Sequence, residues 1–111
     1  LEKLKKCSAN SFLTVLKRFG TSNNAFLSFP QPGWTLAVDL PASNSKLLKV
    51  LDELDNELAT LGGKIYLAKD LRQSAYIFKK TYKLYPKWRS IKSEMDPKNI
   101  FQSDLSIRLG I

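Results

Sequence analysis

The sequence predicts an α+β fold in which an antiparallel or mixed sheet carries helices on one face and a short helical segment follows. Apolar and polar residues alternate with a period of two in residues 12–19 and 34–40, as they do in strands. Leucines at heptad-like spacing in residues 47–61 indicate an amphipathic helix. A third short strand is expected at Lys64–Lys69. The order strand, strand, helix, strand predicts a split β-α-β arrangement.

The bulk composition is that of one globular domain. The 111 residues, 43% of them hydrophobic, suffice for one modest core. The formal net charge of +8 indicates an anionic partner, which could be a phosphate, a nucleic acid, a lipid surface or an acidic cofactor. A single cysteine, Cys7, cannot form an internal disulfide, so a reduced, cytoplasmic compartment is expected. No apolar run approaches the roughly 20 residues of a spanning helix.

The N-terminal residues 1–6 resemble the tail of a longer helix, and they begin with Leu1 in place of an initiator Met. We therefore expect a fragment of a longer protein. The helix should end within residues 8–11, where Ser-Ala-Asn-Ser has low helix propensity.

The first predicted strand has two partly apolar faces, as in an inner strand. One face holds Leu13, Val15, Lys17 and Phe19, and the other holds Phe12, Thr14, Leu16 and Arg18. The two faces of the second strand differ in polarity. The more apolar face is formed by Trp34, Leu36, Val38 and Leu40, and the other by Thr35, Ala37 and Asp39. The connection contains a polar loop, a short apolar run at residues 26–29 and Pro30-Gln31-Pro32-Gly33, which cannot supply ladder donors at its prolines.

The predicted helix begins after a cap at Ser43 or Asn44 and ends at Gly62-Gly63. Its apolar stripe consists of Leu47, Leu51, Leu54, Leu58 and Leu61. We expect its acidic residues to form a solvated face: Asp52, Glu53, Asp55 and Glu57.

The C-terminal part is strongly basic and rich in aromatic residues. Ten basic residues lie between positions 64 and 98: Lys64, Lys69, Arg72, Lys79, Lys80, Lys83, Lys87, Arg89, Lys92 and Lys98. Two short helices divided by Pro86 are expected there, followed by a turn at residues 96–99 and a helical return over residues 100–109 with Phe101, Leu105 and Leu109 at helical spacing. An alternative function follows from this composition: a small basic module that binds nucleic acid through residues 76–92. Contact with an anionic membrane surface is a third interpretation, without an amphipathic anchor helix.

Several kinds of chemistry are excluded. The chain has no histidine, so Ser/His/Asp and Cys/His catalysis and the usual zinc sites cannot be assembled within it, and no metal is expected. No G-x-G-x-x-G or G-x-x-x-x-G-K-[ST] phosphate cradle is present. Lys17 and Lys69 each extend an otherwise apolar strand face. Such lysines usually reach into water, and alternatively they line a cleft and stabilise negative charge on a substrate or cofactor.

Four blocks of sequence carry a resemblance to a known family. They are Phe12–Gly20, Leu27–Trp34, Tyr66–Asp70, and Met95-Asp96-Pro97 with Phe101–Leu105. In this order they resemble the C-terminal part of vanillyl-alcohol-oxidase-type flavoproteins. The chain is most similar to decaprenylphosphoryl-ribose oxidases and more distantly to sugar-lactone oxidases, namely the D-arabinono-1,4-lactone and L-gulonolactone oxidases.

The resemblance implies a division of the chain. Residues 1–63 would be the C-terminal part of a substrate or cap domain, and residues 64–111 the C-terminal return segment of a split FAD-binding domain. The upstream part of that domain would be the main partner of this chain and would make most of the contacts with FAD. Peripheral membrane association and oligomer formation are compatible with this division, and nucleic acid is not expected as a partner.

The resemblance also implies roles for individual residues. Lys69 and Lys17 would be catalytic, with Lys69 near the pyrimidine end of the flavin, where a cation favours the anionic reduced form, and Tyr66 would also contact the cofactor. Lys17, Thr35 and Ala37 would face the substrate, a sugar or lipid-linked sugar. The implied reaction is oxidation of a sugar or polyol hydroxyl carbon by hydride transfer to flavin, and the fragment alone is expected to be inactive.

Overall fold

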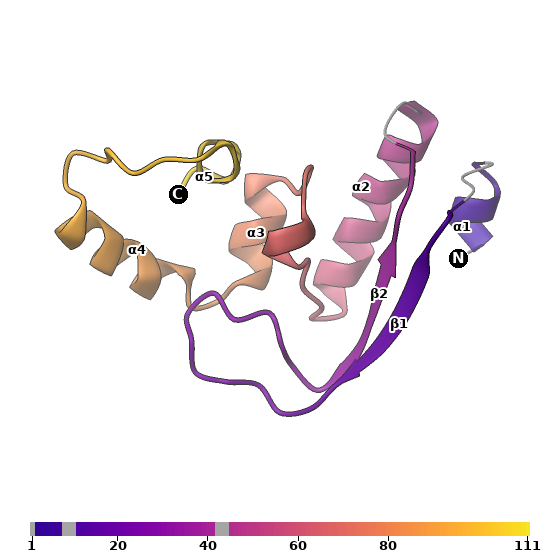
Figure 1. Cartoon of the computed structure of the whole chain (residues 1–111), viewed down its shortest axis with the longest axis horizontal. Coiled ribbons are helices and arrows are strands. Elements are labelled where there is room, and N and C mark those ends of the chain that lie inside the picture. The colour runs from indigo at the N-terminus through magenta and orange to yellow at the C-terminus, as the bar shows by residue number, and fades with distance from the viewer. Residues whose placement is uncertain (1, 8–10, 42–44) are drawn as a thin grey trace. The chain divides into compact units, whose positions relative to one another are not determined.

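The computed structural model describes residues 2–7, 11–41 and 45–111, and this part of the chain has the predicted α+β fold (Figure 1). Within these described residues, two antiparallel strands are accompanied by five α-helices and one 3-10 helix. The elements are α1 (Glu2–Lys5), β1 (Thr14–Phe19), β2 (Gly33–Val38), α2 (Ser45–Thr60), η1 (Leu67–Lys69), α3 (Ala75–Thr81), α4 (Tyr85–Met95) and α5 (Asp104–Leu109). Contacts divide the chain into two compact units, residues 1–23 with 30–54 and residues 24–29 with 55–111. The domain boundary predicted after residue 63 stays a prediction.

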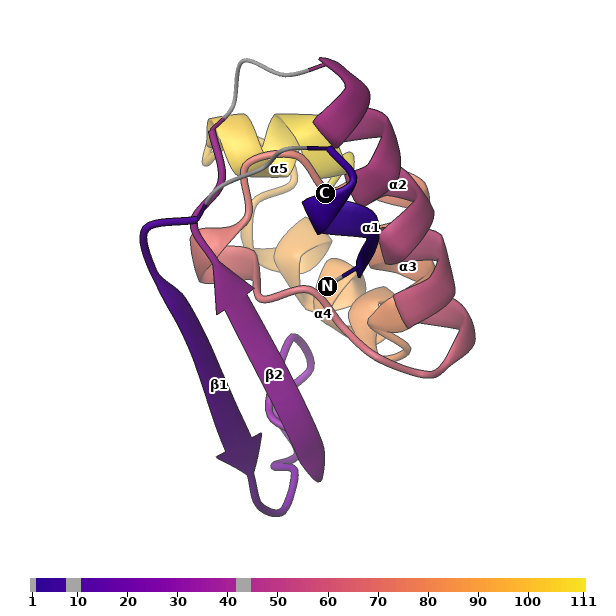
Figure 2. The same cartoon turned by 90° about the vertical axis from the view of Figure 1, so that its right-hand side faces the viewer.

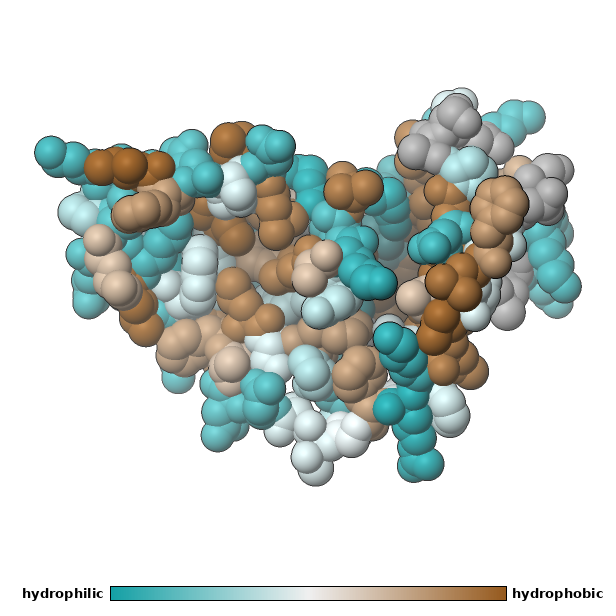
Figure 3. Space-filling view, in the orientation of Figure 1, coloured by the Kyte–Doolittle hydropathy of each residue, from teal (hydrophilic) through white to brown (hydrophobic). Residues whose placement is uncertain are grey.

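The first unit contains the hairpin of β1 and β2, whose strands run side by side in opposite directions (Figure 2). Lys17 pairs with Thr35, and Leu16 pairs with Leu36. The expectation that the first strand is an inner strand is wrong in the described part of the chain, where the sheet has only these two strands. As a result Leu16 and Trp34 remain 61% and 68% exposed. Apolar side chains of this kind reach the surface, drawn in brown in Figure 3, among polar ones in teal.

Helix α2 follows its predicted stripe at Leu47, Leu51 and Leu54, whereas Leu58 is exposed. Leu47 is 1% exposed, whereas Leu61, beyond the helix, is 85% exposed. The cap predicted at Ser43 or Asn44 lies outside the described residues. The helix ends as predicted, because Gly62 takes a φ of +78°, which a glycine adopts without strain, and the Gly63 N–H then donates to the Leu58 carbonyl at 2.8 Å.

The strand predicted at Lys64–Lys69 is wrong. Residues 63–66 lie outside regular secondary structure, and Leu67–Lys69 form the 3-10 helix η1. The Lys69 N–H donates to the Tyr66 carbonyl at 3.1 Å, and the Asp70 N–H to the Leu67 carbonyl at 3.4 Å. The split β-α-β arrangement therefore lacks its third strand in the described chain, while the α+β class is confirmed.

The second unit has an aromatic core. Phe78, Tyr82, Tyr85 and Leu109 are buried together. The Phe78 ring centroid lies 5.2 Å from that of Tyr82 and 5.1 Å from that of Tyr85, distances typical of favourable aromatic pairs. Ser74 caps α3 by accepting from the Ile77 N–H, and the core joins α3, α4 and α5.

The last helix begins later than predicted. Asp96 follows α4, and its carboxylate accepts from the backbone N–H groups of Ile100 and Phe101 at 2.8 and 3.0 Å. These bonds hold residues 96–101 in a turn, so Phe101 is 78% exposed instead of lying on the helix. Helix α5 starts only after Ser103, whose side chain forms a capping box with Ser106.

Candidate functional site

Tyr66 and Lys69, the predicted cofactor-binding residues, lie on one turn of the second unit. The Tyr66 ring is half-exposed and contacts Phe29, with the ring centroids 5.0 Å apart. Lys69 is the last residue of η1 and is exposed. Residues 66–69 thus present an aromatic ring and a cation at the surface, and we call them the Lys69 turn.

Tyr82 holds the beginning of the Lys69 turn. Its hydroxyl donates to the Ile65 carbonyl at 2.7 Å. Burial, followed by the nearby negative charge of Asp70, raises the pKa of Tyr82 to about 12. The hydroxyl is therefore protonated at neutral pH and acts as a permanent donor.

Lys64 also contacts the region around the Lys69 turn. Lys64 Nζ donates to the Ser28 carbonyl at 3.0 Å and lies 5.5 Å from the centre of the Tyr82 ring. The second of these distances is within the range of a cation–π contact. Lys64 therefore links the segment before the turn both to residues 24–29 and to the aromatic core.

Asp70 and Arg108 hold the end of the turn. The Asp70 side chain is 3% exposed, and its Oδ1 accepts from the N–H groups of Arg72 and Gln73 at 3.0 and 2.8 Å. Its Oδ2 accepts from Arg108 Nη2 at 3.0 Å. The Arg108 guanidinium also donates to the carbonyls of Asp70, at 3.1 Å, and Gln73. Helix α5 is thereby tied to the residue that directly follows Lys69.

A second ion pair joins the same segment to α2. Arg72 Nη2 lies 2.7 Å from Asp55 Oδ1, and Asp55 is only 7% exposed. The prediction that Asp55 belongs to a solvated face is therefore wrong. Asp52, Glu53 and Glu57 are exposed as predicted. Asp55 differs because the arginine supplies an opposite charge that makes burial of its carboxylate tolerable.

Lys17, Thr35 and Ala37, the predicted substrate residues, lie on the hairpin of the first unit. Lys17 is directly opposite Thr35, and Ala37 is opposite Val15, so all three share one face. Lys17 and Ala37 are exposed, and Thr35 is partly buried. An ammonium group and a hydroxyl on neighbouring strands can together bind the oxygen atoms of a hydroxylated or anionic ligand. Their role in binding stays a prediction.

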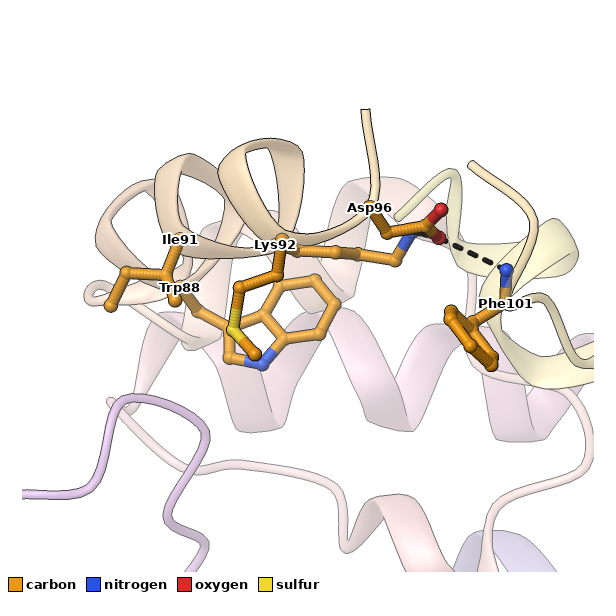
Figure 4. Close-up of a pocket in the computed structure, with 6 residues that line it drawn as sticks. Trp88, Ile91, Lys92, Asp96 and Phe101 are labelled. Atoms are coloured by element: carbon orange, nitrogen blue, oxygen red, sulfur yellow. Dashed lines mark hydrogen bonds and ion pairs between the residues drawn. The ribbon is translucent and has the colours of Figure 1, made fainter. Parts of the chain in front are cut away.

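A hollow of about 270 Å³ in the second unit is separate from the predicted site residues (Figure 4). It is lined by Trp88, Ile91, Lys92, Met95, Asp96 and Phe101. The Asp96 carboxylate is occupied by Lys92 Nζ at 3.3 Å and by the Ile100 and Phe101 N–H groups. The Asp96 carboxylate at the edge of this hollow therefore stabilises the fold through these bonds.

Three residues that shape the Lys69 turn were not predicted from the sequence: Tyr82, Asp70 and Arg108. Asp70 carries a local signal, because an Asp that binds the N–H groups two and three residues ahead forms a common turn. Tyr82 and Arg108 carry none, since they lie 17 and 38 residues from their partners Ile65 and Asp70.

Among the described residues, no group of three or more His, Cys, Asp or Glu side chains could hold a metal ion. The helices of this same part of the chain are also too short or too polar to cross a membrane.

No protein-family model matches the chain. Over 101 residues it is 42% identical to decaprenylphosphoryl-β-D-ribose oxidase from Mycolicibacterium smegmatis, a match that covers 91% of this chain and 22% of that protein. The chain is similar to part of an oxidase. It is also 42% identical over 97 residues to the "uncharacterized protein in mprA 5′region" of Streptomyces coelicolor, which covers 87% of this chain and 26% of that protein. The chain thus spans about a quarter of the length of these curated relatives. The resemblance to sugar-lactone oxidases stays a prediction.

Proposed function

We propose that this chain is the C-terminal part of an FAD-dependent oxidoreductase that oxidises a hydroxyl carbon of a sugar or polyol. The proposal rests on its 42% identity, over 91% of its length, to decaprenylphosphoryl-β-D-ribose oxidase. That name joins a ribose to a decaprenylphosphoryl group, so a lipid-linked sugar is the substrate class that we favour.

The Lys69 turn has the chemistry that one edge of a flavin ring would need. It presents an aromatic ring and an ammonium group on a short helix whose two ends are fixed by side chains. The chain has no glycine-rich phosphate cradle, so an upstream FAD-binding domain would supply most of the cofactor contacts. When bound, FAD would supply the acceptor for the hydride that leaves the substrate.

In this proposal the residues of the chain act through charge and position. Lys69 would hold a positive charge against the cofactor ring, where a fixed cation stabilises developing negative charge more than mobile water does. Tyr66 would pack against the cofactor. Lys17 and Thr35, opposite each other on the hairpin, would bind and orient substrate oxygens, and Ala37 would leave space beside them.

The burial of the aromatic residues argues against the alternative of a nucleic-acid-binding module. Phe78, Tyr82 and Tyr85 are 0%, 1% and 5% exposed, so they cannot stack on bases. Tyr76, at 65%, is the exposed tyrosine of this stretch. The lysines around it would give weak association that is independent of sequence and lost at high salt.

The experiment uses the full-length protein that contains this chain. We expect it to bind flavin, which its visible absorbance would report after purification or reconstitution with FAD. Lys69→Met should slow flavin reduction by substrate while flavin stays bound. Lys83→Met, the same change at an exposed lysine outside the Lys69 turn, should leave the rate unchanged.

Two results would contradict the proposal. A full-length protein that stays flavin-free after reconstitution would exclude the function itself. A Lys69→Met protein that is reduced as fast as the wild type would remove the role of Lys69.

A further inference from the structure

The Lys69 turn has little hydrogen bonding of its own. Within η1 the backbone makes the two bonds from the Lys69 and Asp70 N–H groups, the second of them at 3.4 Å. A 3-10 helix of three residues with such bonds has poor intrinsic stability. Its conformation therefore depends on side chains from elsewhere in the second unit.

These side chains bind the backbone on both sides of Lys69. We propose that Tyr82, Asp70 and Arg108 are positioning residues that fix the Lys69 ammonium for catalysis, an inference that rests on the proposed function. Tyr82 binds the carbonyl before the turn, and Asp70 and Arg108 bind the backbone after it. The three residues act through Lys69 and do not need to touch the substrate or cofactor.

The Tyr82 contact is directed at the backbone of the turn. Its hydroxyl donates to the Ile65 carbonyl, directly before Tyr66. The ring is 1% exposed and packed on Phe78, so the ring holds its hydroxyl in a fixed position. A rigid aromatic residue of the core therefore sets the path of the chain into η1.

The Asp70–Arg108 pair is directed at the backbone in the same way. The carboxylate accepts from two N–H groups and the guanidinium donates to two carbonyls, all within residues 70–73. A buried ion pair is a weak source of net stability, because desolvation offsets most of its attraction. Its effect here is to select one backbone conformation directly after Lys69.

Position matters because electrostatic stabilisation requires a charge that is already in place. A displacement of about 1 Å in a positioned group can cost about 100-fold in rate. Lys69 is exposed, and its ammonium group is carried by a flexible four-carbon stem. The protein therefore controls the position of the ammonium group mainly by fixing the backbone of Lys69.

The test is a mutant cycle in the flavin-loaded full-length protein. Tyr82→Phe removes one hydroxyl and should slow flavin reduction by about 10-fold or more, with flavin still bound. In the Lys69→Met background it should cause no further loss. The matched control is Tyr85→Phe, which removes a hydroxyl from the same core without touching the turn, since that hydroxyl donates to the Gly110 carbonyl at 3.4 Å. It should leave the rate unchanged.

A second measurement does not depend on activity. In the flavin-free full-length protein, hydrogen exchange of residues 65–70 should be faster in Tyr82→Phe and in Arg108→Lys than in the wild type, and unchanged in Tyr85→Phe. Arg108→Lys keeps a cation for Asp70 but lacks the fork that reaches both carbonyls, and it avoids leaving a buried charge unpaired.

The outcomes separate this inference from the proposed function. If Tyr82→Phe slows reduction equally with and without Lys69, its role is only structural and the inference is overturned. The same holds if exchange of residues 65–70 does not change, or if Lys69→Met slows reduction while Tyr82→Phe does not. A wild-type protein that cannot bind flavin would overturn the proposed function, and the inference with it.

Discussion

Arg108→Met is expected to be the most informative perturbation of stability. It removes a guanidinium that binds the Asp70 carboxylate at 3.0 Å and two backbone carbonyls. The Asp70 side chain, 3% exposed, would keep two N–H donors but lose its counter-charge, and breaking such a buried pair costs about 3–5 kcal/mol. Because the Arg108 side chain itself is 27% exposed, water can partly replace it. We therefore expect about 3 kcal/mol, at the low end of that range.

Urea unfolding followed by circular dichroism measures this loss as a lower midpoint at an unchanged m-value. Adding Asp70→Asn to Arg108→Met should restore part of the stability, because the amide carries no charge and its oxygen can still accept from the N–H groups of Arg72 and Gln73. The coupling should be about 1–3 kcal/mol. As a control, Arg89→Met removes an exposed guanidinium that contacts the Tyr85 hydroxyl at 3.3 Å, and it should cost about 0.5 kcal/mol or less. Strictly additive effects of Asp70→Asn and Arg108→Met would refute the idea that the two charges depend on each other.

Three further predictions concern the fold. Phe78→Ala should destabilise the protein by about 3–5 kcal/mol, because the ring is 0% exposed at the centre of the aromatic core; a urea midpoint near the wild-type value would contradict this. Gly62→Ala should cost about 1–2 kcal/mol in the same assay, since φ is +78° there, whereas Gly20→Ala, at a position with open space, should cost less. Burial opposes ionisation of Asp96, but the Ile100 and Phe101 N–H groups and Lys92 outweigh it and lower its pKa. Ionised Asp96 therefore stabilises the fold above the unfolded-state pKa of about 3.9, and this stability is lost as the pH falls through the lowered folded-state value. Asp96→Asn should accordingly unfold more easily at pH 7, with the difference from wild type shrinking in acid; a constant difference would exclude this explanation.

The hairpin and α2 could be predicted because their signals are local. Alternation in residues 14–19 and 33–38 and the leucine stripe of α2 are visible within a few neighbouring residues, and Gly62 marks the helix end by itself. The run Lys64–Lys69 shows the limit of this reasoning. Six alternating residues fit any extended segment, and a strand needs a neighbour that accepts its hydrogen bonds. Here the Ile65 carbonyl accepts its hydrogen bond from the Tyr82 hydroxyl and not from a neighbouring strand, and the residues that follow form η1.

The candidate site could be predicted only in part. Tyr66 and Lys69 are close in sequence, but the predicted strand would have turned them to opposite faces, and it is η1 that puts them on one turn. Pairing of Lys17 with Thr35 required only the correct register of one hairpin. The anchors of the Lys69 turn could not be found in this way, because Arg108 and Asp70 meet only after α3, α4 and α5 have packed.

The aromatic and basic stretch from Tyr76 to Lys92 shows how burial separates two interpretations that composition does not. Phe78 lies on α3, Tyr82 is the C-cap of that helix and Tyr85 begins α4, and all three rings are buried in the aromatic core. Tyr76, Lys79, Lys83 and Lys87 are exposed, and Lys80 Nζ lies 5.6 Å from the Tyr76 ring centre. An array of stacking platforms would need several exposed rings on one side. The stretch is instead a core face with a charged exterior, and the same burial that removes its rings from solvent fixes the Tyr82 hydroxyl beneath the Lys69 turn.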